Sequence, residues 1–473
     1  MRWHYLGHAM WLLELGEEGT RVLFDPLLHD VHDDGLSSVS PRRELACELL
    51  RPDFVVVSHR HPDHFDVDSL AWLAAIDPEC VVLTSDELVA AVCRRLSFVQ
   101  VRVLGLWEQV ELCGGTLTTT PSYGTCVEWG VAVSSADGVV WNHVDSVLGS
   151  ANQAERTLEV LRGAAGQGVN LHLARWCPVL EVSAQLAGRI GFPRGTYAEL
   201  LQGLAVLASE PTCFAPAAVS VVPLAPNDAL ASNAFPVTRA QFARDLSALS
   251  PNARLLDLNV GDTLTVERGV TQRWPGKSPY VRAVDGGELP TFVPFEVAPL
   301  RDPWPCPSGD AVARIRNWLE NELGPQLSRL SGEGQNSLPV ALCLDLRSGD
   351  KPYGSVGEAC ARSAASWTLL LTVGSWSLQP GIDPSYDQLV AVSLGGLLRV
   401  LDGVSSWGEL LLSGQLRCSD RAYRVVHGQS GGALERISWL PALFVYSAPG
   451  YEESFETATW RRVDDLRRKG KGQ

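Results

Sequence analysis

The run Ser58-His59-Arg60-His61-Pro62-Asp63-His64 follows directly on the apolar stretch Phe54-Val55-Val56-Val57. Such a stretch predicts a buried strand, so the run lies on the loop at the strand's carboxyl end. The loop offers imidazoles and a carboxylate, a mixture of ligands that suits zinc, iron or manganese. Because alternate side chains of a loop can face either side of a cavity, we expect two adjacent metal ions. His59 and His61 would hold one, and Asp63 and His64 the other.

The surrounding sequence alternates between strand and helix patterns, which predicts an α/β fold. Residues 1–28 predict a hairpin with strands at 3–15 and 20–24, joined by a turn at 16–19. A helix is expected at 68–76, directly after the ligand run. Strand-rich layers with helices outside them, arranged in two halves, indicate an αβ/βα sandwich over residues 1–283.

The chain has 473 residues, more than one ordinary hydrophobic core accommodates, so we expect two domains. Residues 284–310 contain six prolines without a clear period and predict a linker. A smaller α+β domain is expected at 311–473. Its segment 387–410 resembles a sterol-carrier-like module, which would supply an apolar cavity or a homodimer surface; the alternative is a generic α+β domain.

The composition limits which classes of partner the protein can bind and indicates the compartment in which we expect it. The net charge of −15 argues against a nucleic-acid partner, which requires clustered Lys and Arg. The basic stretch at 461–471 is interpreted as a solvated chain end. Eleven scattered cysteines without a CxxC pair indicate reduced thiols. No stretch approaches the roughly 20 apolar residues of a membrane span. We expect a cytoplasmic protein without a membrane span.

The ligand run resembles that of the metallo-β-lactamase superfamily, and the resemblance extends over about residues 1–270. Three further motifs agree with it: Gly7-His8-Ala9 with Phe24-Asp25-Pro26, Val144-Asp145-Ser146 after a hairpin, and Gly261-Asp262 near the close of the domain. The resemblance implies that Asp145 bridges the two metal ions. It also implies that His8 and Asp25 orient the ligands through hydrogen bonds.

The sequence departs from the hydrolases of this superfamily at the third histidine. No histidine lies between His64 and His143, and the nearby acid on the corresponding hairpin is Glu128. A carboxylate there makes the site richer in oxygen and favours iron over zinc. This pattern is similar to the nonheme diiron monooxygenases of natural-product biosynthesis, of the chloramphenicol β-hydroxylase and platensimycin diterpenoid hydroxylase types. The alternative is that Glu128 is a surface acid at a strand end.

The second departure concerns the last histidine of the superfamily pattern. The corresponding segment, Phe214-Ala215-Pro216-Ala217-Ala218, contains none. His172 is the preferred replacement, and His143, His427 or no histidine at all are the alternatives.

The resemblance implies O2-dependent hydroxylation of an unactivated carbon at a diiron site, with Glu128 and Asp145 as catalytic ligands. The expected substrate is a natural-product intermediate, either lipophilic or carrier-bound. Because the sequence lacks a Gly-rich nucleotide fingerprint, electrons would come from an external donor or reductase. The alternative is a hydrolase that uses two zinc ions on an ester, amide or phosphodiester. A third reading, a binding scaffold with a decayed site, is opposed by the complete ligand run.

Overall fold

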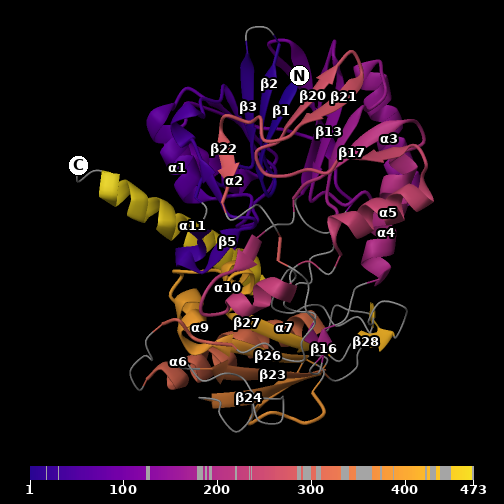
Figure 1. The fold of residues 1–473 in the computed structure, drawn as a ribbon. Helices are drawn as coiled ribbons and strands as arrows, with labels where there is room; N and C mark the ends of the chain where they lie inside the picture. The colour runs from indigo at the N-terminus through magenta and orange to yellow at the C-terminus, as the bar shows by residue number, and fades with distance from the viewer. Residues whose placement is uncertain are drawn as a thin grey trace.

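The structure is a computed structural model whose described residues fall into an N-terminal αβ/βα sandwich and a smaller C-terminal α+β part (Figure 1). The expected fold class is therefore confirmed. The described residues are 1–16, 19–29, 31–123, 128–177, 185–186, 189–190, 194–218, 221–233, 235, 237–284, 289–290, 300–304, 310–331, 340–347, 365–372, 375–386, 388–420, 423–426, 433–436 and 449–470.

The first sheet of the sandwich has eight strands in the order β21-β20-β1-β2-β3-β7-β8-β9. Helices α1 (Val67–Ile76) and α2 (Glu87–Arg95) follow β7 and β8, and α2 packs against β8 and β9. The strand bounds are β1 (Arg2–Gly7), β2 (Met10–Leu15), β3 (Thr20–Phe24), β7 (Phe54–Val57), β8 (Val81–Thr84), β9 (Gln100–Val103), β20 (Thr263–Glu267) and β21 (Val270–Trp274).

The second sheet has seven strands in the order β10-β11-β12-β13-β14-β17-β19. Helices α3 (Ala151–Ala165), α4 (Arg194–Leu207) and α5 (Arg239–Leu249) lie on its outer side (Figure 1). The strand bounds are β10 (Gln109–Leu112), β11 (Gly115–Pro121), β12 (Trp129–Ser135), β13 (Gly138–Val144), β14 (Leu171–Ala174), β17 (Thr212–Pro216) and β19 (Ala253–Leu255).

Two hydrophobic clusters hold these layers together. The larger contains residues of both sheets, such as Trp3 and Leu12 of the first and Val140 and Leu171 of the second. The other contains Trp141 of β13 with residues of α3, α4 and α5. Since neighbouring residues of β13 face opposite clusters, its period of two determines which side chains reach the space between the sheets.

The expected hairpin is wrong in one respect that matters for the site. Residues 3–15 do not form one strand but two, β1 and β2, which pair with each other in antiparallel fashion. The chain reverses at Gly7 and His8, whose φ angles are +102° and +52°. An apolar pattern does not reveal such a turn, because the residues on both sides of it are buried strand residues.

The C-terminal part contains a five-stranded sheet in the order β25-β24-β23-β26-β27. The core of this part includes Trp407, which is buried at the start of α10 and packs against Trp318, so this end of segment 387–410 belongs to the core. The bounds are α6 (Ala311–Trp318), a π-helical turn (Leu319–Leu323), α7 (Gly324–Ser331), β23 (Val340–Arg347), β24 (Ala365–Thr372), β25 (Ser375–Pro380), β26 (Gln388–Ser393), α9 (Leu394–Leu401), α10 (Trp407–Leu412) and β27 (Leu416–Asp420).

Five short elements connect the two parts or extend them: β4 (Val31–His32), β5 (Ser37–Val39) and β18 (Val221–Pro223) form one small sheet, and β6 (Arg43–Leu45) pairs with β22 (Val281–Ala283). Residues 300–304 of the expected linker are packed between the parts. The backbone N–H of Arg301 donates to Asn227 at 2.9 Å, and that of Gly395 donates to Asp302 at 2.8 Å. This described portion of the linker is thus tied to both parts.

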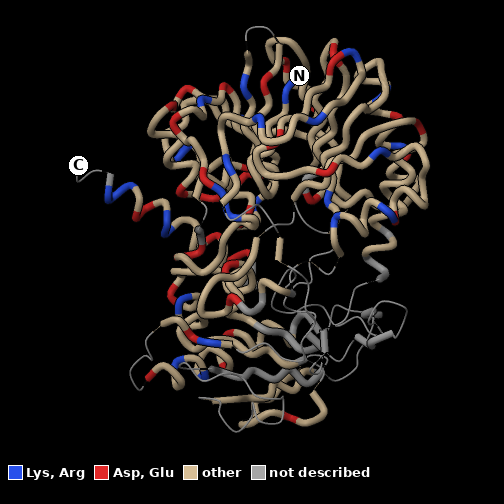
Figure 2. Tube along the Cα trace, viewed as in Figure 1, with Lys and Arg blue, Asp and Glu red and all other residues tan. Residues whose placement is uncertain are grey.

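The last helix, α11 (Pro449–Gly470), returns to the N-terminal sandwich and packs on α1 and α2 (Figure 1). Val463 is fully buried in the core of that sandwich, and Arg462 forms two hydrogen bonds of 2.8 Å with Asp68 of α1. The interpretation of 461–471 as a solvated end is therefore wrong for Val463 and Leu466, which pack on the sandwich, whereas Arg461, Arg468 and Lys469 are exposed. Figure 2 shows basic and acidic residues following one another along α11, and the apolar Val463 and Leu466 between them pack on the core of the sandwich.

Among the described residues, no helix is both long enough and apolar enough to cross a membrane.

Phe455 of α11 offers a test of this packing. Its ring lies 6.2 Å from that of Phe65, the residue after the ligand run, and both side chains are buried. Phe455→Ala should lower the free energy of unfolding of the N-terminal sandwich by about 3 kcal/mol, because a large buried ring leaves a cavity. Hydrogen exchange of α1 and α2 would measure it. Glu453→Ala, on the exposed side of the same helix, is the control, and equal protection in both variants would contradict the assignment.

A second test concerns the ionised carboxylate of Glu14, on β2. Its pKa is lowered to about 2 by the hydrogen bond with His4, against burial, and further by the Tyr280 hydroxyl, which donates to it at 2.6 Å. Since the folded pKa lies below the unfolded value, this stabilisation is present above about pH 4.5 and is lost as the pH falls toward 2.

Glu14→Gln should therefore lower stability by about 1–2 kcal/mol at pH 7 and have less effect at pH 3. Denaturant unfolding at both pH values measures the difference. Glu267→Gln, at an exposed position at the end of β20, serves as the control. A deficit of the Glu14 variant that does not change with pH would show that the carboxylate is not the stabilising group.

Candidate metal centre

The ligand run occupies a tight loop between β7 and α1. The backbone N–H groups of His64 and Phe65 both donate to the carbonyl of His61 at 2.9 Å, and Asp66 caps α1 by accepting from Ser69. Val57, the last residue of β7, is fully buried, so the loop starts from a rigid point. Sequence and packing therefore present the run as one preformed unit.

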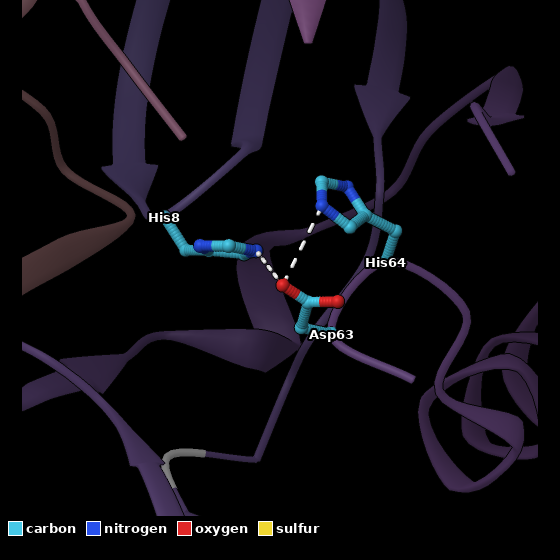
Figure 3. A group of neighbouring side chains, drawn as sticks. All are labelled: His8, Asp63 and His64. Carbon is cyan, nitrogen blue, oxygen red and sulfur yellow. Dashed lines mark ion pairs between the residues drawn. The ribbon is translucent and has the colours of Figure 1, made fainter. Parts of the chain in front are cut away.

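The structure brings the expected ligands together in three overlapping groups, each with its ligand atoms within 4.8 Å of one another. Because His59 and His64 each belong to two groups, the three groups form one continuous site. The groups are His59 with His61 and Glu128, His59 with His64 and Asp145, and His8 with Asp63 and His64. Figure 3 shows the third of these groups, in which His8 and His64 point toward the Asp63 carboxylate from two sides.

Glu128 and Asp145 come from two neighbouring strands of the second sheet. Glu128 precedes β12 and Asp145 follows β13, and since these strands are antiparallel both residues lie at the same edge. Ser122 joins Glu128 to the turn that follows Asp145: its hydroxyl donates to Glu128 at 3.4 Å and accepts from the backbone N–H of Val147 at 2.9 Å. Asp145 lies in a turn closed by the Ser146 N–H, which donates to the carbonyl of His143.

Asp25 orients the ligand loop. Its carboxylate accepts hydrogen bonds from the backbone N–H of Ser58 at 2.7 Å, from the Ser58 hydroxyl at 2.8 Å and from Nδ1 of His64 at 3.0 Å. With Nδ1 engaged in this way, Nε2 of His64 faces the carboxylate of Asp145 at 3.1 Å. The contact between Asp25 and Nδ1 of His64 is the carboxylate–histidine pairing that commonly sets the tautomer and direction of a metal-binding imidazole.

His8 lies closer to the site than an orienting residue requires. Its Nε2 atom is 3.3 Å from Oδ2 of Asp63, and its carbonyl accepts a hydrogen bond of 3.0 Å from the N–H of Ala218. Ala218 ends the segment in which the superfamily pattern would have its last histidine. The turn after β1 therefore brings an imidazole to the place where the segment after β17 lacks one.

His172 does not reach these groups, contrary to the expectation. It lies on the outer side of the second sheet, stacked on Phe214 at 4.7 Å, and its Nδ1 is 2.9 Å from Nε2 of His143. Strand alternation explains the placement, because Leu171 and Leu173 face the space between the sheets and leave His172 on the helical side. His143 is on the same side, next to a bulge in β13 that turns the following Asp145 toward the site. His427 is outside the described residues.

Two arginines around the ligand loop have roles that the sequence did not predict. Arg60 holds the buried Asp86 in a two-pronged contact of 2.6 and 2.9 Å, and Asp86 caps α2. Arg43 is buried and donates to the carbonyls of Leu6, Gly7 and Leu27. It therefore connects the turn that carries His8 with the segment that follows Asp25. Position alone gives no signal for either role, since both depend on contacts between distant segments.

The acids and the histidines of the three groups shift one another's pKa values. Burial raises the pKa of Asp63 and of Asp145, but the charge of His64 and further histidine contacts outweigh it and hold both values below the ordinary range. Burial lowers the pKa of His64, yet Asp63 and Asp145 raise it well above its usual value. His59 has a lowered pKa because it is buried beside His64 and His61. A neutral imidazole with an accessible nitrogen is the form that binds a metal ion.

Glu128 differs from the other acids. Burial and the negative charge of Asp145 raise its pKa to about 7, against the opposing effect of Arg175 and His64. A carboxyl group in such surroundings needs a cation to become fully ionised, and a metal ion between Glu128, His59 and His61 would supply it.

These residues fit a dinuclear metal centre. Oδ1 of Asp145 is buried and has no hydrogen-bond partner among the described residues, which is the state of an oxygen available as a ligand. The groups provide imidazole nitrogens and carboxylate oxygens for two ions, with Asp145 between them. The donor set suits zinc, iron or manganese.

Comparison with known proteins agrees with the fold. Residues 2–142 match the family model described as the beta-lactamase superfamily domain. A metal-dependent hydrolase of Nitratidesulfovibrio vulgaris is 26% identical over 273 residues, which cover 56% of this chain and 95% of that protein.

A shorter match joins 62 residues, at 37% identity, to the mitochondrial N-acyl-phosphatidylethanolamine-hydrolyzing phospholipase D of Saccharomyces cerevisiae. It covers 12% of this chain and only 13% of the length of that enzyme. Among solved structures, the β-hydroxylase CmlA, a diiron enzyme of Streptomyces venezuelae, is similar in a mutant form with a TM-score of 0.40 and 17% identity, over 58% of this chain and 54% of the other.

The sandwich, the ligand loop after β7 and the match over residues 2–142 lead to one conclusion. Residues 2–142, which include the ligand loop, match the beta-lactamase superfamily domain, and the N-terminal part of this chain has the metallo-β-lactamase fold.

Proposed function

We propose that this protein, a metal-dependent enzyme of the metallo-β-lactamase fold, is a diiron monooxygenase that hydroxylates an unactivated carbon with O2. The observation that carries the proposal is the group formed by His59, His61 and Glu128. A carboxylate there replaces the histidine that hydrolases of this superfamily usually have. Together with Asp63 and Asp145, it gives the site a hard, anionic character that favours iron.

The residues have separate roles in this proposal. His59, His61 and Glu128 would hold one iron, Asp63, His64 and His8 the other, and Asp145 would lie between the two. The two irons, when bound, would supply the electrons for reductive activation of O2. Asp25 keeps Nδ1 of His64 engaged at 3.0 Å, so that Nε2 stays directed into the site. The loop is anchored by Arg60 on Asp86, which limits its movement during turnover.

The substrate proposed is a small natural-product intermediate, lipophilic or carrier-bound. The electrons that reduce the two irons would come from an external donor or reductase, because the sequence carries no nucleotide-binding fingerprint. The C-terminal part would contribute an apolar binding surface or a homodimer contact, as proposed for a sterol-carrier-like module.

A second candidate is a two-zinc hydrolase of an ester, amide or phosphodiester. The observation that favours it is the similarity to a metal-dependent hydrolase over 95% of that protein. In this case the two ions would activate water for attack rather than O2, and the carboxylate of Glu128 would have no special role. The two candidates differ in the metal that the purified protein retains.

Metal analysis with an optical spectrum tests the proposal. The purified chain should contain about two iron ions and show ferric absorption, and its reduced form should consume O2. Glu128→His should shift the retained metal from iron toward zinc and abolish O2 uptake while the fold is kept. Glu111→His, at an exposed position on β10, is the control. Zinc in the parent protein would favour the hydrolase, and unchanged iron and O2 uptake in Glu128→His would show that Glu128 is not the residue that selects the metal.

His8 and His172 provide a second test, because sequence and structure disagree about which of them completes the site. His8→Ala should reduce the metal content from about two ions to about one per chain, since the group with Asp63 and His64 loses its third ligand. His172→Gln, which keeps a partner for His143, should retain the full metal content. The reverse result would restore His172 as the ligand and leave His8 as an orienting residue.

A further inference from the structure

Arg175 extends the row of charged residues at the edge of the second sheet. β14 is parallel to β13, with Ala174 opposite Val144, so Arg175 and Asp145 leave neighbouring strands side by side. Glu128 occupies the same edge on the next strand, β12. Three charged side chains, two acidic and one basic, thus follow one another along the edge that carries the metal groups.

The alternation of side chains along β14 indicates that Arg175, the residue after this strand, faces the inner side of the sheet. Leu171 and Leu173 of β14 lie in the core between the sheets, and His172 and Ala174 lie on the helical side. Continued alternation puts Arg175 on the same side as Leu173, toward the metal groups. The arginine acts on both acids of the edge, since after burial and nearer charges its own charge is among the causes that lower the pKa of Glu128 and of Asp145.

The backbone at Arg175 is held firmly. Its neighbours Ala174 and Trp176 are both buried, Trp176 stacks on Phe235 with ring centroids 5.9 Å apart, and the carbonyl of Ala174 accepts from the N–H of Ala217 at 2.9 Å. The fixed backbone limits the region that the guanidinium can reach, and ordering the side chain on a ligand costs its rotamer freedom.

Arg175 forms no hydrogen bond and no ion pair with any residue that the structure describes, although Glu128 and Asp145 are near. Arg60, which is also part-buried, has a carboxylate partner in Asp86. A guanidinium beside the candidate metal groups, with its donors uncommitted among the residues that the structure describes, is suited to a planar or tetrahedral oxyanion that arrives with the substrate.

We propose that Arg175 binds an oxyanion of the substrate, a carboxylate or a phosphate, and thereby places the substrate beside the metal centre. This inference rests on the proposed metal centre but holds for either metal. It narrows the substrate class to molecules that carry such a group within reach of the reacting atoms. A carrier-bound or phosphorylated intermediate fits this requirement, and a wholly uncharged terpenoid does not.

Calorimetric titration of the metal-loaded chain with inorganic phosphate and, separately, with acetate tests the proposal. Arg175→Gln should weaken binding of at least one anion by about 10- to 100-fold, because a charge-assisted hydrogen-bond pair is lost. Arg175→Lys should bind with intermediate affinity, since it keeps the charge without the planar fork. Arg156→Gln, at an exposed position on α3, is the control and should match the parent. Metal content and near-ultraviolet dichroism are recorded for each variant.

The outcomes are distinct. A loss confined to phosphate assigns a phosphate, a loss confined to acetate assigns a carboxylate, and both support the anion site. Unchanged affinity for both anions in Arg175→Gln would overturn it. So would a loss of metal in Arg175→Gln that Arg175→Lys restores, because the arginine would then only balance the charge of the ligands. If the parent chain as purified retains two zinc ions and still shows the Arg175 effect, the monooxygenase is contradicted and the anion site stands.

Discussion

The three hydrogen bonds accepted by Asp25 are the contact on which the site depends. They join the end of β3 to the first residue of the ligand run and to the Nδ1 atom of His64. Asp25 has a φ angle of +42°, an uncommon conformation for a residue other than glycine, and it is fully enclosed. Such strain persists where the surroundings determine the conformation, and here the surroundings are the parallel strands β3 and β7 and the candidate metal-binding loop.

From this contact the site extends across the gap between the sheets. The first sheet contributes His8 and the ligand loop, and the second contributes Glu128, Asp145 and the proposed anion-binding Arg175. A buried set of acids and imidazoles would be unfavourable without compensation, since each charge loses its hydration. The mutual pairing seen at His64 supplies part of that compensation, and two metal ions would supply the rest.

The C-terminal part of the chain packs against the part that carries the candidate metal centre. α11 lies against α1 and α2, with Phe455 on Phe65 immediately beyond the ligand run, and residues 300–304 are bonded to both parts. A cavity of about 140 Å³ lies at this junction and is lined by Pro62 and Phe65 of the ligand loop together with residues of α9, α10 and α11. A change in the packing of the C-terminal part can therefore alter the position of Pro62 and Phe65 in the ligand loop.

The sequence by itself determined the class of fold, the ligand run, and the presence of Glu128 and Asp145 on the hairpin edge, because these follow from local periodicity and short spacing. The tertiary structure decided the rest. His8 rather than His172 joins the metal groups, because a turn hidden in an apolar stretch brings His8 beside Ala218 while strand alternation turns His172 outward. In the same way the basic end of the chain became a packed helix and Arg175 became a neighbour of Asp145. Each depends on contacts between segments far apart in the sequence, which local patterns do not encode.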